Sequence, residues 1–246
     1  MLKVLRAELI KLPWLLIGGI ALASPAFAVL LGVGEGGSIP GVSPWLATFD
    51  NTVMQYAWLF YPLLAGVFAA LICRADHAAG GWKLTLALPV RRTHVYLAKY
   101  LVLAGVLALT NLAFGAVFLI AGSLRGIHGA IPYSTIGMAL LSGWVAVLPL
   151  AALQLWVSSR WRSFGAALAL NVCLTLPSIF AAQSHDIGPW YPWAQPLLAM
   201  VSFVSRQTGE RMLNVSPTTL WVVVVGGFVV AMVGGLLTFA RADIRQ

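Results

Sequence analysis

Charged residues are scarce in this chain: they make up 9% of its 246 residues, whereas hydrophobic residues make up 60%. An average soluble domain carries about 25% charged residues, so the composition excludes that class. Apolar stretches of about 20 residues, the length of a helix that crosses a bilayer, recur along the chain. These stretches are continuous rather than alternating, which argues against a membrane β-barrel. The sequence therefore predicts an all-α integral membrane protein.

The residues that several kinds of chemistry require are also missing. The centres of the predicted spans hold no Asp, Glu, Lys or Arg, which argues against proton relays, ion-coupled transport and intramembrane catalysis. No GxxxxGK[ST] motif is present, so the chain does not bind a nucleotide in the P-loop manner. The four histidines are far apart and predict no metal site. We expect no bound cofactor, and we expect the two cysteines, Cys73 and Cys173, to stay reduced.

Six apolar segments are long enough to be membrane spans, and we predict one six-helix domain over residues 1–246. The expected spans are 13–33, 53–73, 94–121, 134–157, 164–182 and 220–240. Residues 34–52 are expected to form a loop. The leucines of Met1–Lys11 share one helical face, which predicts an interfacial helix before the first span. Polar side chains within the spans are expected to form interhelical hydrogen bonds, with substrate contact as the alternative: Asn111, Gln154 and Asn171.

Basic residues alternate sharply between the two sides of this six-span arrangement. One side has three at the N-terminus, five in the second loop, two in the fourth and two at the C-terminus, twelve in all. The other side has one in the third loop and two in the fifth. Because basic residues stay inside, both termini are expected to be cytoplasmic, in a bacterial inner membrane. The net charge of +8 is then explained by the orientation of the protein in a lipid bilayer and does not indicate binding to nucleic acid.

The loop between the second and third spans is longer than a turn requires. It contains two adjacent glycines, a short apolar segment that begins at Trp82, and Pro89, which ends that segment. Beyond it, Arg92, Tyr96 and Lys99 share one helical face. We interpret the loop as a contact surface for a cytoplasmic partner. The alternative is that its basic residues only fix the topology and Trp82 only anchors it.

The fifth loop, residues 183–219, is also too long for a simple connector. It holds an aromatic and proline-rich cluster, which we call the outer crown: Trp190, Tyr191, Pro192 and Trp193. The apolar run from Leu197 to Val204 is too short to cross a bilayer. We predict a re-entrant or interfacial hairpin on the outer side. The alternative is an aromatic belt on a loosely ordered loop.

These segments resemble a known family. Asp76, Gly81-Trp82-Lys83, Leu88-Pro89-Val90, Arg91-Arg92, Tyr96 and Lys99 are similar to the first cytoplasmic loop of type 2 ABC transporter permeases. The resemblance is closest to bacitracin-resistance and lantibiotic-immunity permeases. Residues 7–12 resemble the N-terminus of that family, and residues 191–193 resemble its outer-loop motif. The family usually has Glu where this chain has Asp76.

The resemblance implies a six-helix permease subunit of an exporter that hydrolyses no ATP itself. It implies two ATPase subunits that dock on the cytoplasmic side, and pairing with a second permease, either a copy or a paralogue. The first cytoplasmic loop would transmit the motion of the ATPases through Asp76, Gly81, Trp82, Lys83, Pro89, Arg91, Arg92, Tyr96 and Lys99. From the outer crown and the uncharged span centres, we predict an amphiphilic cargo such as an antimicrobial peptide. The alternatives are a membrane-embedded enzyme acting on lipid head groups and a non-transporting assembly or sensor subunit.

Overall fold

The computed structural model describes residues 1–34, 41–77, 91–161, 163–208 and 216–241, without the side chains of 205–208. The described residues form helices and connecting turns, with no strand among them. In chain order the helices are α1 (Leu2–Ile10), α2 (Trp14–Gly34), α3 (Pro44–Gln55), the π-helix η1 (Tyr56–Phe60), α4 (Tyr61–His77), α6 (Arg92–Leu124), α7 (Tyr133–Arg160), α8 (Phe164–Thr175), α9 (Ser178–Gln183), the 3₁₀-helix η3 (Gly188–Trp190), α10 (Gln195–Thr208) and α11 (Pro217–Ala240).

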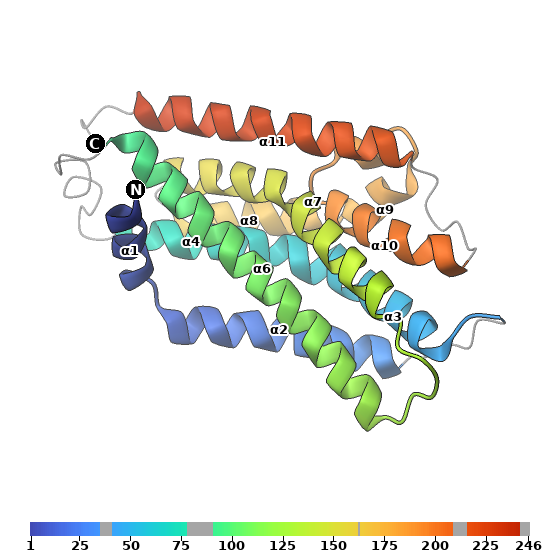
Figure 1. Cartoon of the computed structure of the whole chain (residues 1–246). Helices are drawn as coiled ribbons and strands as arrows, with labels where there is room; N and C mark the ends of the chain where they lie inside the picture. Colours follow the sequence, from blue (N-terminus) through green and yellow to red (C-terminus); the bar gives the residue numbers. More distant parts are fainter. Residues whose placement is uncertain (35–40, 78–90, 162, 209–215, 242–246) are drawn as a thin grey trace.

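Within the described residues, six helical segments are long and apolar enough to cross a membrane, which confirms the predicted fold class. They are Trp14–Gly34, Pro44–His77, Arg92–Leu124, Tyr133–Arg160, Phe164–Gln183 and Pro217–Ala240. The N-terminus and the ends of α4 and α11 lie at one end of the bundle, where α6 begins (Figure 1). We call this the N-terminal end and the opposite one the crown end. Helix α7 lies at the centre, against α4, α6, α8, α10 and α11.

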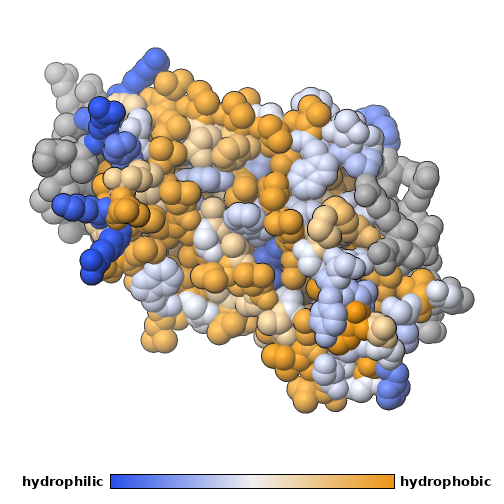
Figure 2. Space-filling model, in the orientation of Figure 1, coloured by the Kyte–Doolittle hydropathy of each residue, from blue (hydrophilic) through white to orange (hydrophobic). Residues whose placement is uncertain are grey.

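The surface matches a bundle surrounded by lipid. The face in Figure 2 is mostly apolar, and strongly hydrophilic side chains gather at the N-terminal end. Large apolar side chains such as Leu15, Leu109 and Val230 are more than 60% exposed. Because lipid tails solvate such side chains, their exposure carries no cost in a membrane.

Residues 44–52 are helical, so for them the prediction of a loop over residues 34–52 was wrong; residues 35–40 lie outside the described residues. Ser43 caps α3 by accepting a hydrogen bond from the Leu46 N–H, and Pro44 occupies the first turn. Trp45, Phe49 and Val53 recur at helical spacing and are buried. Asp50, the acidic residue of α3, is also buried, with 5% of its surface exposed.

The second span is irregular just before Pro62. Proline has no N–H, so the carbonyl of Trp58 loses its partner four residues ahead. The Tyr61 N–H bonds instead to the Tyr56 carbonyl, five residues back, which produces the π-helix. The Ser178 hydroxyl lies 3.5 Å from the Trp58 carbonyl and donates to it. A side chain of α9 thus satisfies a backbone group that lipid would leave unpaired.

In its described part, the fifth loop contains two helical pieces, η3 and α10. The apolar residues of α10 are buried, and the helix packs chiefly on α7. Gly143 of α7 permits this approach: a Cβ at this position would lie 2.5 Å from the Met200 side chain. The loop is therefore partly folded into the bundle, and its position relative to the membrane remains a prediction.

Candidate functional site

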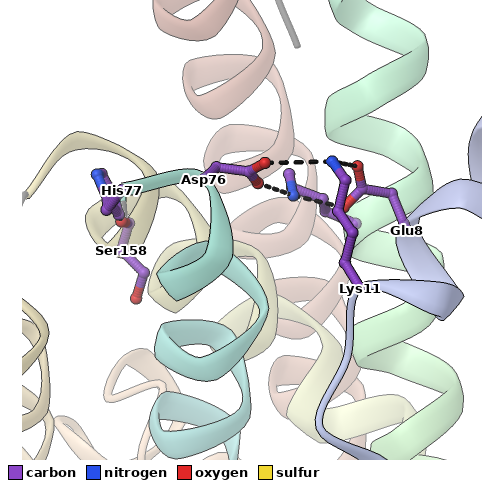
Figure 3. A network of polar contacts seen from close by, with 6 residues as sticks. Glu8, Lys11, Asp76, His77 and Ser158 are labelled. Atoms are coloured by element: carbon purple, nitrogen blue, oxygen red, sulfur yellow. Dashed lines mark hydrogen bonds and ion pairs between the residues drawn. The ribbon is translucent and has the colours of Figure 1, made fainter. Parts of the chain in front are cut away.

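Four charged side chains meet at the N-terminal end of the bundle, from three separate helices (Figure 3). We call Glu8, Lys11, Asp76 and Lys99 the ion network. The Lys11 ammonium lies 2.9 Å from Glu8 Oε1 and 3.2 Å from Asp76 Oδ1. The Lys99 ammonium contacts Glu8 Oε2 and Asp76 Oδ2. Each lysine therefore bridges both carboxylates, and the four charges cancel.

The ion network is buried on one side and open on the other. The exposed fractions of the side chains are 1% for Lys99, 2% for Asp76 and 4% for Glu8, but 34% for Lys11. Removing ions from water costs several kcal/mol each, so the buried members depend on one another for stability. The network therefore fastens α1 to the end of α4 and the start of α6. These ends flank residues 78–90, the main part of the predicted coupling loop.

Four of the predicted coupling residues make three different kinds of contact. Asp76 and Lys99 meet in the ion network. Tyr96 is buried against α11, where it packs on Phe239 with a distance of 5.5 Å between ring centroids. Arg92 donates a hydrogen bond to the Ala240 carbonyl at 3.2 Å. Because Tyr96 and Lys99 are fully buried, they do not form the exposed contact face that the helical spacing suggested.

The other predicted residues of this loop do not add to the geometry of the site. Arg91 is exposed at the N-cap position of α6, where its extended backbone begins the helix. Gly81, Trp82, Lys83 and Pro89 lie outside the described residues. The predicted role of all these residues in contact with an ATPase therefore stays a prediction.

Two members of the network, Glu8 and Lys11, were missed as site residues. Lys11 was only the last residue of the predicted interfacial helix, and Glu8 was included only in the resemblance of residues 7–12. The available signal was charge balance: Lys99 stands among apolar residues of a long span and needs a carboxylate partner. The sequence did not indicate which carboxylate would be near it.

The outer crown divides into exposed and buried residues. Trp190 is 69% exposed, whereas Trp193 is 6% exposed, and its indole N–H donates to Asn171 Oδ1 at 2.8 Å. The Tyr191 hydroxyl donates to the Leu174 carbonyl at 2.6 Å, and burial raises the pKa of this phenol. Pro192 is half-buried between them. Within the crown, Trp190 is therefore the aromatic ring best placed to meet a molecule from outside.

Asn171 connects the crown to the helices beneath it. Its Oδ1 accepts hydrogen bonds from Trp193 and from Gln154 Nε2, both at 2.8 Å. Its Nδ2 donates to the Leu63 carbonyl at 2.9 Å, just after the π-helix. Gly66 makes room for it, since a Cβ at residue 66 would lie 2.2 Å from Nδ2. The expectation that Asn171 and Gln154 form interhelical hydrogen bonds is confirmed.

Comparison with known proteins identifies the kind of chain that carries this site. A family model described as ABC-2 family transporter protein matches residues 2–178. The match covers well over half of the chain and includes all four members of the ion network. No curated protein matches the chain.

Proposed function

The chain belongs to the ABC-2 family of transporter proteins, as a multi-pass permease subunit of an ABC transporter, and we propose that it couples ATP hydrolysis on a partner subunit to export of an amphiphile. The ion network is the observation that carries this proposal. An ATPase can shift a permease between two states only through contacts that differ between those states. A force on residues 78–90 would reach α4 and α6 directly, and the network would pass it to α1.

The arrangement of charges favours a transport role over an enzyme acting on lipid head groups. Such an enzyme would need a carboxylate or histidine available for acid–base chemistry. Asp76 is bound by two lysines, and the neighbouring His77 donates its Nε2–H to the Ser158 carbonyl at 2.8 Å. Both groups are therefore engaged in holding helices together.

The ABC-2 family implies association with ABC ATPase subunits and with the membrane. In our proposal these subunits dock at the N-terminal end, which faces the cytoplasm of a bacterium. A second permease, identical or paralogous, completes the transport path.

The proposed cargo is a membrane-active amphiphile such as an antimicrobial peptide. Trp190 offers an exposed aromatic ring at the crown end. Because tryptophan settles at the membrane interface, this ring would lie at the same depth in the membrane as an amphiphile. A small hydrophilic ion would lose its hydration among the apolar spans, which is costly.

The proposed orientation predicts the labelling of single cysteines. After Cys73 and Cys173 are replaced by alanine, Ser184→Cys should react with a membrane-impermeant maleimide in intact cells. Lys83→Cys and Arg160→Cys should react only after the cells are permeabilised, because basic residues stay inside. Labelling of Lys83→Cys in intact cells would refute the six-span topology.

The proposed cargo predicts a role for Trp190 in tolerance to peptides. The complete complex, expressed in a sensitive host, should raise the tolerated concentration of some antimicrobial peptide, and Trp190→Ala should lower that gain about tenfold, as expected for loss of an aromatic contact. Tyr133→Ala is the matched control, because Tyr133 is a 65% exposed aromatic at the same end outside the crown. Unchanged tolerance across a broad peptide panel, with an assembled complex that hydrolyses ATP, would exclude this cargo.

A further inference from the structure

A small pocket lies at the N-terminal end of the bundle, apart from the ion network. It is formed where α4 ends, α7 ends and α8 begins, it is open to the surroundings on one side, and its cavity volume is about 30 Å³. One water molecule needs about 10–15 Å³ on this measure, so two or three heavy atoms of a ligand can enter the pocket and the rest would lie outside it. The described residues that line it are Ala70, Arg74, His77, Ser158, Trp161, Ser163, Phe164 and Ala167.

One side of this pocket is suited to an anion. Arg74 is exposed in the last turn of α4 and provides a permanent positive charge. Ser163 caps α8 by accepting from the Ala166 N–H, so the positive end of that helix dipole adjoins the pocket. A Cβ at Gly165 would meet nothing nearer than 3.9 Å, so the backbone of this first turn is open to approach. None of the described residues that line the pocket is a carboxylate.

A buried hydroxyl group gives a second, independent indication that this pocket is a ligand-binding site. Ser158 is 2% exposed, and its Oγ has no hydrogen-bond partner among the described residues. The backbone carbonyl of Ser158 is already engaged by His77 at 2.8 Å, so this residue is held in place (Figure 3). Buried polar groups are nearly always paired, and an unpaired hydroxyl lining a pocket points to a group that fills it.

The other side of the pocket is apolar. Ala70 and Ala167 are buried beneath it, while Trp161 and Phe164 are 43% and 37% exposed beside it. Tryptophan settles at the boundary between head groups and acyl chains. A ligand there would place a charged group against Arg74 and an apolar chain along the two rings.

We propose that this pocket binds the phosphate group of an anionic membrane phospholipid. A phosphate diester accepts hydrogen bonds from a guanidinium, a hydroxyl and helix N–H groups, all of which are present here. Basic pockets between transmembrane helices are a recurrent form of lipid head-group recognition. The bound lipid would join α4, α7 and α8 at their shared end. This proposal does not depend on the transport function.

Titration of purified protein with phosphatidylglycerol or phosphatidylcholine of the same acyl chains, read by native mass spectrometry, tests the proposal. Phosphatidylcholine has the same phosphate but adds a cationic choline, which the positive charge of Arg74 repels. The wild-type chain should therefore bind phosphatidylglycerol about tenfold more tightly, and Arg74→Gln should remove that preference. Arg160→Gln is the matched control: it removes an exposed charge from the neighbouring end of α7 without altering the lining. It should change the affinity by less than about twofold.

A second variant separates a shaped site from general attraction to positive charge. Ala167→Leu fills the pocket and keeps every charge, so it should also abolish the preference for phosphatidylglycerol. Equal loss in Arg74→Gln and Arg160→Gln, or unchanged binding in Ala167→Leu, would overturn the pocket. In a separate arm, inorganic phosphate should displace phosphatidylglycerol only weakly. Displacement at equal concentrations would overturn the assignment to a lipid.

Discussion

Replacing Lys99 with methionine is expected to destabilise the protein by about 3–5 kcal/mol, the usual cost of breaking a buried ion pair by removing one partner. Lys99 is 1% exposed and contacts both Glu8 and Asp76. In the variant the two buried carboxylates would face each other with Lys11 as the remaining lysine of the network. We expect a lower Tm in detergent and loss of substrate-stimulated ATP hydrolysis in the assembled complex.

Lys11→Met is the matched control for this experiment. Lys11 bonds to the same two carboxylates, but its side chain is 34% exposed. Because water screens exposed ion pairs and can replace them, we expect Lys11→Met to lower the free energy of unfolding by less than about 1 kcal/mol. If Lys11→Met and Lys99→Met lowered the Tm equally, burial would not be the source of the stabilisation.

A triple variant separates stability from coupling. Glu8→Gln with Asp76→Asn and Lys99→Met leaves no buried charge unpaired, so most of the lost stability should return. If the ion network transmits movement to α1, this variant should remain assembled with slow basal ATP hydrolysis and should show no stimulation by substrate. Full stimulation in the triple variant would mean that the network only stabilises the fold.

Much of the fold could be predicted from the sequence because the signal for a membrane span is strong and local. Each span needs only about 20 consecutive apolar residues, and no distant partner has to be known. Pro62 likewise marks an irregularity by its own chemistry, since it lacks an N–H. Helix α3 was missed because the short apolar face formed by Trp45, Phe49 and Val53 lies among polar and small residues.

The candidate site was harder to predict because it depends on contacts between distant residues. Asp76 and Lys99 were selected through a resemblance, but Glu8 lies 91 residues before Lys99. The helical spacing of Arg92, Tyr96 and Lys99 correctly places them along one side of α6. It does not tell whether that side faces a partner protein or α1 and α11 of the same chain.

The outer crown shows the same limit of prediction from sequence, because the sequence does not tell which of its aromatic residues is buried. Trp190 and Trp193 are three residues apart and have the same preference for a membrane interface. Their environments differ because Asn171, which lies 22 residues before Trp193, provides an acceptor for Trp193. Trp193 is thereby drawn into the bundle, and the exposed Trp190 is left for contact with other molecules.

Asn171→Leu is expected to lower the stability of the protein by about 3 kcal/mol and to loosen the crown end. The substitution removes the acceptor of Trp193 and Gln154 and the donor to the Leu63 carbonyl. An unpaired buried polar group costs about 1–3 kcal/mol, and a hydrogen bond between membrane helices contributes about 0.6 kcal/mol on average. Between these two values, the loss of three hydrogen bonds is expected to cost about 3 kcal/mol in total. Tm measurements and hydrogen exchange of the α10 amides would record the effect.

Asn111→Leu is the matched control for Asn171→Leu. Asn111 is also buried and donates one hydrogen bond, to the Leu140 carbonyl at 2.6 Å. Its Oδ1 has no partner among the described residues, so the same substitution should cost only about 1 kcal/mol. It should also leave exchange in α10 unchanged, because the bond joins α6 to α7 and does not involve the crown. Equal losses, or unchanged protection of α10 in Asn171→Leu, would show that Asn171 does not hold the crown to the bundle.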